Sequence, residues 1–382
     1  MLPAERVLCA FEHREYDCVP IYVAGLSSRV ASAVLGREAY VGGGIQQYRE
    51  ACALWEGEEA HREFLERSLR DALELIRVLD LDVVRSAYWR MPQRPTKRLD
   101  ERTFLYGDPE GAWRIMRFDP ETELYQVVAR SPEAEPTLEE LEREARRARE
   151  TAEAYRPRPE DFPDLNAALA EFGGERAVPG RGAGLCIPRQ EAWLAAIALR
   201  PEVVHMLLEA QIVRARKNIR VMAEMGLRFI QGGGDFASKA GPFYSPQAFS
   251  ALMLPRLKEI SAECKRQGCF HMFASDGNLW PVAQELFGES GVDCYYEIDG
   301  RAGMDLAQLR RRFPHLTLMG GISSETLHLG TREDVVRETR AALRAAKEYG
   351  SIIVGCSNQV VAMTPVENFQ TMIDVLHNER AL

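Results

Sequence analysis

The sequence of 382 residues contains no uncharged apolar stretch long enough to cross a membrane. A membrane-spanning helix needs about 20 consecutive apolar residues, so we expect no membrane span and no membrane partner. Glu5 and Arg6 interrupt the first apolar residues, which argues against a secretory signal peptide. Positive charge is not in excess either, since 48 Lys and Arg against 57 Asp and Glu leave a net charge of −9. We therefore expect no nucleic-acid partner for the chain as a whole.

Cysteine pairs and nucleotide-binding motifs are absent as well. The eight cysteines have no paired spacing and form no Cys-x-x-Cys motif, so we expect reduced thiols in a cytoplasmic protein. No predicted strand runs into G-x-G-x-x-G or G-x-x-x-x-G-K-[ST], the glycine-rich loops that hold dinucleotides and nucleotide phosphates. A doubly wound nucleotide-binding sheet is therefore disfavoured.

The composition itself, 46% apolar and 27% charged residues, is typical of a folded globular protein. Eight apolar runs alternate with longer charged segments, and several runs are continuous, as in parallel strands buried on both faces. With helices between them they predict a (β/α)8 TIM barrel, a single domain over residues 1–382 with an N-terminal extension. The predicted strands are Val19–Gly25, Val83–Trp89, Ala177–Cys186, Phe229–Ala237, Cys269–Gly277, Cys294–Gly300, Leu316–Ser323 and Ser351–Asn358.

Three helix starts support this alternation. Ser245 before a proline predicts an N-cap followed by Pro at the first helical position. Thr364, Pro365 and Glu367 predict a capping box with Thr364 as the cap. Thr331 precedes two acidic residues, which the helix dipole favours at an N-terminus.

One stretch, residues 100–160, does not fit the barrel and is predicted to be an insertion. Residues 103–128 contain short β-prone runs separated by turn residues, which predict a hairpin or a three-stranded meander after the second strand. Residues 132–158 are dense in Glu, Arg and Ala, and they predict a solvated surface helix with charge pairs four residues apart.

Polar residues at the ends of the predicted strands are the candidates for chemistry, because a TIM barrel builds its active site there. The last five strand ends supply Asp235, Asp276, Glu297, Ser323 and Cys356 to one rim. Glu297 lies in an apolar run, where a carboxylate needs a metal, a cation or a proton nearby. We predict catalytic roles for Asp235, Asp276 and Glu297.

Each candidate also has a purely structural interpretation. Asp235 and Asp276 adjoin glycines and are typical of turns or helix caps as well, and Cys356 is typical of a small core residue. His271 lies in the middle of a strand, where a core histidine is the more ordinary interpretation. Such residues at five successive strand ends nevertheless favour a functional cluster over independent accidents.

A substrate pocket with aromatic walls is expected at the same rim. Tyr22, Trp89 and Tyr244 lie at or near predicted rim positions and are expected to contact the substrate. Ser323 and Asn358 are expected to bind its polar groups.

Short motifs between Gly232 and the C-terminal residues point to a family. They are Gly241-Pro242-Phe243-Tyr244-Ser245-Pro246, Ser275-Asp276-Gly277-Asn278, Gly291-Val292-Asp293, Leu318-Met319-Gly320-Gly321-Ile322 and Gly355-Cys356 followed by Thr364-Pro365-Val366-Glu367-Asn368. Together they resemble the uroporphyrinogen decarboxylase superfamily, and the Thr-Pro-x-Glu-Asn helix start is the most specific of them. The resemblance implies a (β/α)8 barrel, in agreement with the strand pattern.

The superfamily contains two chemistries. Its decarboxylases carry an N-terminal arginine-rich motif for the carboxylates of a tetrapyrrole, whereas the first strand here has only Arg29 close by. This disfavours a decarboxylase, although Arg85 lies in the second strand and Arg90 and Arg94 follow it. The other branch resembles corrinoid-dependent methyltransferases, which the resemblance implies would hold zinc with a His-x-Cys after the fifth strand and a Cys in the eighth.

Only part of that zinc pattern is present. Cys356 matches the eighth-strand cysteine, but Ala274 and Asp276 occupy the His and Cys positions of the fifth strand. The resemblance therefore implies at most a mixed site, made of Asp276, Glu297 and Cys356, with His271 as a further candidate ligand; zinc accepts such oxygen ligands.

From the resemblance we expect a methyltransferase. It would move a methyl group from a small O- or N-methyl donor to the cobalt of a separate corrinoid protein, with metal or acid activation at the rim. The expected partners are this donor and the corrinoid protein, and a homodimer is allowed for. A decarboxylase-like lyase and a non-catalytic barrel that binds a small molecule are the alternatives.

Overall fold

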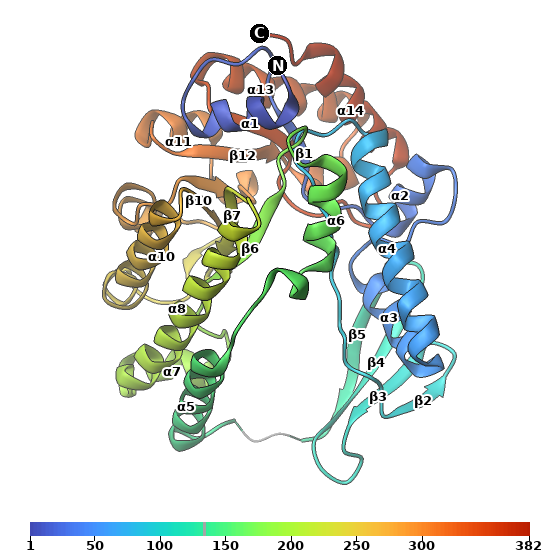
Figure 1. The fold of residues 1–382 in the computed structure, drawn as a ribbon, viewed down its shortest axis with the longest axis vertical. Coiled ribbons are helices and arrows are strands. Elements are labelled where there is room, and N and C mark those ends of the chain that lie inside the picture. Colours follow the sequence, from blue (N-terminus) through green and yellow to red (C-terminus); the bar gives the residue numbers. More distant parts are fainter. Residues whose placement is uncertain (133–134) are drawn as a thin grey trace.

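A curled parallel sheet forms the centre of the protein in the computed structural model, which describes residues 1–132 and 135–382 (Figure 1). The sheet has seven strands in the order β1-β13-β12-β11-β10-β7-β6, all paired in parallel. The class is therefore mixed α/β, as predicted. The strands are β1 (Ile21–Val23), β6 (Pro179–Gly184), β7 (Phe229–Gly233), β10 (Phe270–Ala274), β11 (Cys294–Tyr296), β12 (Thr317–Ile322) and β13 (Ile352–Cys356).

The predicted second strand, Val83–Trp89, is reduced to a short bridge between the two edges of this sheet. The Asp82 amide donates to the Ile21 carbonyl on one side. On the other side Val83 pairs in parallel with Ala177, whose amide donates to the Asp82 carbonyl. After Val84 the backbone leaves the sheet. Residues 82–84 thus link β1 to the segment that leads into β6.

An apolar cluster fills the inside of the curled sheet. It takes one buried residue from each strand or strand-like segment, as expected where inward residues form layers. Helix α1 (Pro3–Phe11) covers one end of this interior, where Phe11 lies 4.7 Å from Phe229 between ring centroids. The predicted N-terminal extension therefore closes the N-terminal end of the sheet. The inward residues are Tyr22, Val83, Ala177, Phe229, Met272, Cys294, Met319 and Ile353.

Helices pack around the outside of the sheet through a second, larger apolar core. Among the described residues no helix is both long and apolar enough to cross a membrane. The helices are α2 (Ser28–Leu35), α3 (Gly44–Glu56), α4 (Glu58–Val78), α5 (Leu138–Ala154), α6 (Pro163–Phe172), α7 (Glu191–Leu199), α8 (Pro201–Glu224), α9 (Pro246–Ala248), α10 (Leu254–Arg266), α11 (Leu306–Arg312), α12 (Ser324–Leu329), α13 (Arg332–Tyr349) and α14 (Val366–Glu379).

Shorter turns complete the helical elements. They are 3-10 turns at Pro159–Asp161, Trp280–Val282 and Gly300–Ala302, and π turns at Phe249–Met253 and Gln284–Glu289. A two-stranded ribbon of β8 (Ala237–Ser238) and β9 (Gly241–Pro242) follows β7.

Two of the three predicted helix starts are confirmed. Ser245 accepts from the Ala248 amide and Thr331 accepts from the Asp334 amide, each as an N-cap. The third prediction, with Thr364 as a cap, is wrong. Helix α14 begins one residue later with Pro365 in the cap position, and the buried Thr364 hydroxyl has no hydrogen-bond partner among the described residues.

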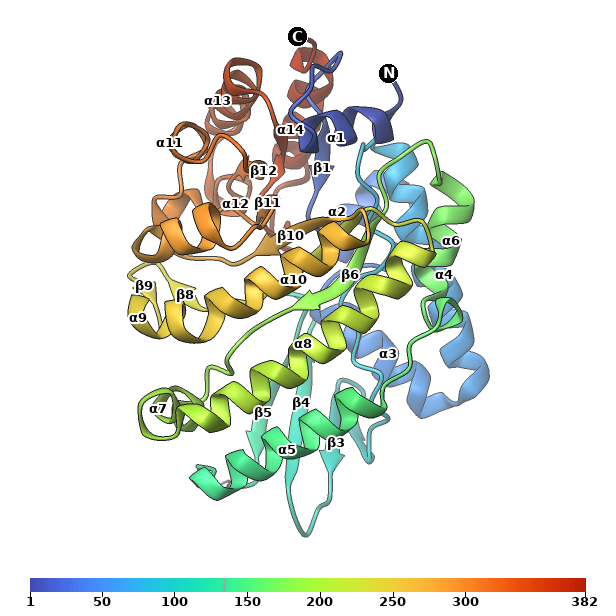
Figure 2. The same ribbon diagram turned by 60° about the vertical axis from the view of Figure 1, so that its left-hand side comes forward.

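The predicted insertion forms a separate antiparallel sheet and a helix. The sheet has four strands, one more than the largest predicted meander: β2 (Lys97–Asp100), β3 (Thr103–Gly107), β4 (Trp113–Asp119) and β5 (Leu124–Arg130). Figure 1 shows it beside α3, apart from the parallel sheet. Helix α5 is not a free surface helix. It lies along α8 (Figure 2) and buries Leu141, Ala145 and Ala152 there.

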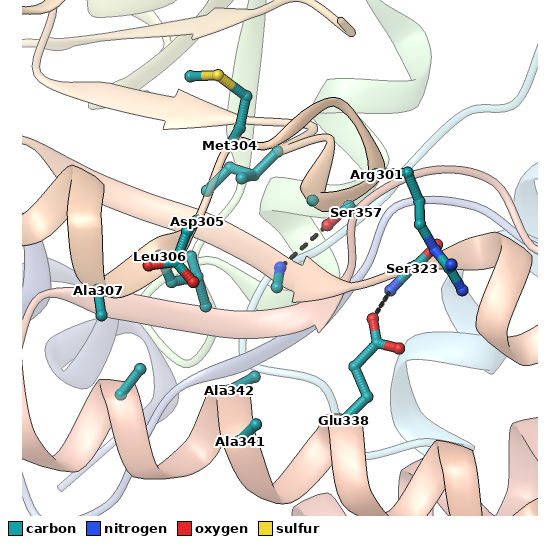
Figure 3. A pocket seen from close by; sticks show the side chains of 14 residues that line it. Arg301, Met304, Asp305, Leu306, Ala307, Ser323, Glu338, Ala341, Ala342 and Ser357 are labelled. Atoms are coloured by element: carbon teal, nitrogen blue, oxygen red, sulfur yellow. Dashed lines mark hydrogen bonds between the residues drawn. The ribbon is translucent and has the colours of Figure 1, made fainter. Parts of the chain in front are cut away.

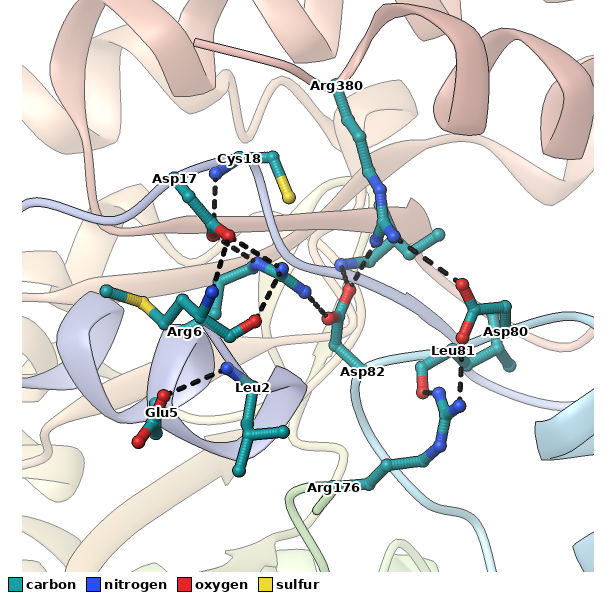
Figure 4. A network of polar contacts seen from close by, with 12 residues as sticks. Leu2, Glu5, Arg6, Asp17, Cys18, Asp80, Leu81, Asp82, Arg176 and Arg380 are labelled. Carbon is teal, nitrogen blue, oxygen red and sulfur yellow. Dashed lines mark hydrogen bonds and ion pairs between the residues drawn. The ribbon is translucent and has the colours of Figure 1, made fainter.

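A buried ion-pair network ties the chain ends to the N-terminal end of the sheet (Figure 4). The Asp82 carboxylate is 1% exposed and is paired with both Arg6 and Arg380. It also accepts from the Ile21 amide at 2.7 Å. Because the three donors come from the first helix, the first strand and the end of α14, this one carboxylate joins three distant segments.

Candidate active site

A cavity of about 270 Å³ lies at the C-terminal end of the parallel sheet, between β1, β11 and residues 85–89. We call it the mouth cavity. Its walls combine aromatic rings with both signs of charge, and the side chains that matter below are Tyr22, Arg85, Trp89, Arg181, Tyr296 and Glu297. Of the predicted site residues, the structure places Glu297, Tyr22 and Trp89 here.

Glu297 follows β11 directly and has an unusual backbone. Its φ is +63°, in the left-handed region that residues other than glycine seldom adopt. Such a conformation costs on the order of 1 kcal/mol and persists only where the surrounding structure holds it in place. Tyr296, just before it, donates from its hydroxyl to the Gly232 carbonyl at 3.0 Å and thereby fixes the end of β11 against β7.

The electrostatic surroundings of Glu297 favour its protonated form. Burial, followed by the negative charges of Asp276 and Asp235, raises its pKa to about 7. Arg85 acts in the opposite direction but does not cancel these effects. Glu297 can therefore hold or release a proton near neutral pH, which is the property of a general acid or base.

Asp276 and Asp235 lie next to each other on the same rim. The Asp276 amide donates to the Asp235 carboxylate at 3.3 Å, and both Asp276 oxygens accept from the Asn358 side-chain amide, at 2.9 and 3.2 Å. Burial and the charges of Asp235 and Asp299 raise the pKa of Asp276 to about 6. Asn358, a predicted substrate-binding residue, thus holds a catalytic candidate in place.

Arg85 is the cation of the mouth cavity. Its guanidinium lies 4.8 Å from the ring centre of Tyr88 and 4.9 Å from that of Trp89, and it donates to the Ala24 carbonyl. Its Nε is buried without a hydrogen-bond partner, and no carboxylate of the described chain lies within 4.0 Å of it. Arg181, in contrast, is neutralised by Asp164 through two hydrogen bonds of 2.6 Å.

The aromatic candidates divide between two places. Tyr22 is buried, and its hydroxyl has no hydrogen-bond partner among the described residues, although it lines the mouth cavity. Trp89 is 43% exposed at the cavity's edge. Tyr244 lies elsewhere, stacked on Phe236 with 5.8 Å between ring centroids. The structure therefore supports the first two as wall residues and gives Tyr244 a packing role.

Ser323 belongs to other hollows. It caps α12, and its amide donates to Glu338 at 2.7 Å beside a cavity of about 380 Å³ between α11 and α13 (Figure 3). A smaller hollow of about 170 Å³ contains Ser323 together with Asp276 and Asn358. Asp276 and Glu297 thus influence each other electrostatically but line different hollows of one rim.

His271 and Cys356 point away from the rim, contrary to their predicted role as metal ligands. Neighbouring residues of a strand face opposite sides. Met272 and Ile353 face the inside of the sheet, so His271 and Cys356 face the surrounding helices. His271 accordingly contacts Ser261 of α10 at 2.8 Å, and burial lowers its pKa to about 3. The Cys356 thiol donates to the Asn358 carbonyl, and burial raises its pKa to about 12.

Comparison with known proteins places the chain in a family. The sequence model of the uroporphyrinogen decarboxylase (URO-D) family matches residues 184–379, just over half of the chain. The chain belongs to the uroporphyrinogen decarboxylase family. The matched part contains β7 to β13, and with them Asp235, Asp276 and Glu297. No curated protein matched the sequence.

Solved structures show where the URO-D fold of this chain recurs. A methyltransferase from Methanosarcina mazei is similar over 99% of both chains, with a TM-score of 0.64 and 15% sequence identity. At this identity the likeness concerns the fold. The IOLI protein with a bound zinc atom is similar over 58% of this chain and 84% of its own, with 11% identity and a TM-score of only 0.31.

The residues present in this URO-D protein do not fit the predicted zinc ion. Cys356 and His271 face the helices, and Asp276 and Glu297 line different hollows. Within residues 1–132 and 135–382, no group of three or more His, Cys, Asp or Glu side chains is arranged to hold a metal. We therefore derive no step through a metal from these residues.

Sequence reasoning underrated Arg85 in this URO-D chain. It lies in the second predicted strand, and Arg90 and Arg94 follow that strand. The other two lie elsewhere, since Arg90 is paired with the buried Glu50 and Arg94 is exposed. A sequence signal was available, because Arg85 lies three and four residues before Tyr88 and Trp89, whose rings can hold a cation.

Proposed function

We propose that this protein is a methyltransferase that moves a methyl group from a small O- or N-methyl donor to the cobalt of a separate corrinoid protein. One observation carries the proposal: Glu297, with its pKa raised to about 7, lines a small aromatic cavity at the C-terminal end of the sheet. Membership of the URO-D family and the fold shared with a methyltransferase support it. We take the sheet with residues 82–84 to be a (β/α)8 barrel.

The chemistry asked of this chain is acid catalysis. When a methyl group leaves an oxygen or nitrogen atom, the bonding electron pair stays on that atom, and a proton must be added to make it a good leaving group. Glu297 in its protonated form donates this proton and becomes a carboxylate. The corrinoid of the partner supplies the nucleophile that takes the methyl group. Solvent then returns the proton to Glu297.

Asp276 and Asp235 act through charge. As carboxylates on the same rim, they make ionisation of Glu297 unfavourable and keep the proton available near neutral pH. The Asn358 amide holds Asp276 in position for this. Both aspartates are therefore positioning residues here, and Glu297 is the catalytic residue.

The mouth of the sheet also suits a protein partner. Apolar side chains of the rim loops are exposed there, which is typical of interaction surfaces. Trp89 is 43% exposed, and Phe243, Val361 and Met363 are exposed as well. A partner that covers these loops would bring its corrinoid to the mouth cavity and exclude water from it.

The test is to incubate the purified protein with a reduced corrinoid protein and a panel of methoxy and N-methyl compounds, and to follow corrinoid methylation by absorption. We expect at least one donor to be demethylated, and Glu297→Gln to slow its transfer by about 100-fold or more. No demethylation by folded protein with any donor would contradict the proposal.

A carboxy-lyase is the second candidate, because the family is named for a decarboxylase and the mouth cavity holds Arg85 and Arg181. Two facts count against it. Arg181 is already neutralised by Asp164. The cavity of about 270 Å³ is also small for a tetrapyrrole, since pockets for drug-sized ligands start at about 300 Å³. Uroporphyrinogen turnover by the same preparation would reverse this preference, and binding of donors without any turnover would indicate a binding protein.

A further inference from the structure

The mouth cavity contains buried polar groups that the protein itself does not satisfy. Arg85 carries a full positive charge, yet no carboxylate within the described residues pairs with it at 4.0 Å or less. Its Nε and the Tyr22 hydroxyl are both buried and without a partner there. Other arginines with a buried unpaired Nε are better satisfied, since Arg310 donates to three carbonyl groups, whereas the one hydrogen bond of Arg85 within the described residues goes to Ala24. A buried guanidinium with so few partners beside an unpaired hydroxyl in one cavity favours a ligand there.

The position of Arg85 limits the chemistry of this ligand. The rings of Tyr88 and Trp89 hold the guanidinium by cation–π contacts, and its bond to the Ala24 carbonyl fixes one end. A guanidinium held in this way presents a planar fork of N–H donors, which matches the two oxygens of a carboxylate. An anion would also offset the cost of burying the charge.

The other residues that line the cavity limit the shape of the ligand. Tyr22, Tyr296 and Trp89 line it with aromatic surface, and rings prefer to pack against other rings. A volume of about 270 Å³ suits a single-ring molecule. Glu297 lines the same cavity, so a ligand held by Arg85 at one end can present a substituent to Glu297 at the other.

We infer that the mouth cavity binds a small aromatic carboxylate, with its carboxylate on Arg85 and its methylated heteroatom towards Glu297. The inference rests on the proposed function and adds the substrate class to it. Methyl transfer breaks the carbon–oxygen bond of the donor, the bonding electron pair stays on the oxygen, and Glu297 donates a proton to that oxygen. Arg85 keeps its proton throughout and serves to bind and orient the donor.

The experiment is a binding titration by calorimetry, with no corrinoid protein present. The probes are 4-methoxybenzoate and its uncharged counterpart 4-methoxybenzamide. We expect the folded wild type to bind the carboxylate about 10- to 100-fold more tightly than the amide, as expected for hydrogen bonds to a charged group. Arg85→Gln should abolish this preference, and Arg85→Lys, which keeps the charge but loses the planar fork, should reduce it.

A matched control separates the local contact from the general charge of the rim. Arg301→Gln removes one positive charge from a half-exposed side chain on the same rim, outside the mouth cavity, and should keep the preference. Equal binding of the two probes by the wild type, no binding of the carboxylate, or an unchanged preference in folded Arg85→Gln would each overturn the inference.

The outcomes also separate this inference from the proposed function. Preferential binding of the carboxylate without methyl transfer to any corrinoid protein would support the substrate class and contradict the methyltransferase. Methyl transfer from neutral donors, with no preference for the carboxylate, would support the methyltransferase and contradict the role of Arg85.

Discussion

Replacing Glu297 by glutamine should make the protein more stable at pH 8 while it removes activity. Burial and neighbouring carboxylates raise the pKa of Glu297 from 4.5 to about 7 in the folded protein. Each pKa unit corresponds to about 1.4 kcal/mol, so ionised Glu297 destabilises the folded state by on the order of 3 kcal/mol. Glutamine has nearly the same shape and never ionises, so the variant escapes this cost.

The raised pKa also determines how the stability of the two proteins depends on pH. The folded state binds the Glu297 proton more tightly than the unfolded state does, so the wild type loses stability as the pH rises from about 4.5 to about 7. Below this range the carboxyl is protonated in both states, and the two proteins should differ little. Above it the variant should be more stable by on the order of 3 kcal/mol.

Urea denaturation of both proteins at pH 5, 6, 7 and 8 measures the difference directly. The control is Glu348→Gln, an exposed carboxylate on α13 with no ion pair among the described residues, which should shift stability equally little at every pH. A difference between wild type and Glu297→Gln that does not change with pH, or a variant that is less stable at pH 8, would refute the reasoning.

Three further predictions follow from other parts of the structure. Asp82→Asn should lower the free energy of unfolding by about 3–5 kcal/mol in urea denaturation, because it removes the buried carboxylate that Arg6 and Arg380 share and leaves them only the exposed Asp17 and Asp80. Asp17→Asn, at a 43% exposed site, should cost far less. Cys356→Ala should leave the metal content, measured by mass spectrometry, and the transfer rate unchanged, since the thiol faces the helices; a loss of bound metal would contradict this. The rate of methyl transfer should fall tenfold per pH unit above about pH 7, where Glu297 loses its proton, and a rate that stays flat to pH 9 would exclude Glu297 as the acid.

The parallel sheet could be predicted from the sequence because its strands are buried on both faces. Seven of the eight predicted apolar runs contain a strand of the sheet. Val83–Trp89 was the exception. Only residues 82–84 pair there, since Arg85 turns to the Ala24 carbonyl and Ser86 donates to Asp164. The polar contacts of a single arginine and serine thus outweigh the β-propensity of the run.

Because the strands are buried on both faces, the sequence does not show which face of the sheet each site residue occupies. A strand that is apolar on both faces has no alternation that tells inside from outside. No sequence pattern therefore predicts that His271 and Cys356 face the helices. Their direction follows from the structure, in which Met272 and Ile353 face the inside of the sheet. Glu297 was found because a carboxylate in an apolar run is rare, whereas its left-handed φ has no sequence signal.

The most direct test of Glu297 as the resident acid is to titrate its carboxyl group. Protein labelled with carbon-13 at the glutamate carboxyl carbon would be followed by NMR from pH 4 to pH 9, with the Glu297 signal identified by its absence in Glu297→Gln. We expect a midpoint at about 7. A midpoint near 4.5, the ordinary value for glutamate, would mean that the mouth cavity holds a carboxylate at neutral pH and would contradict acid catalysis by this residue.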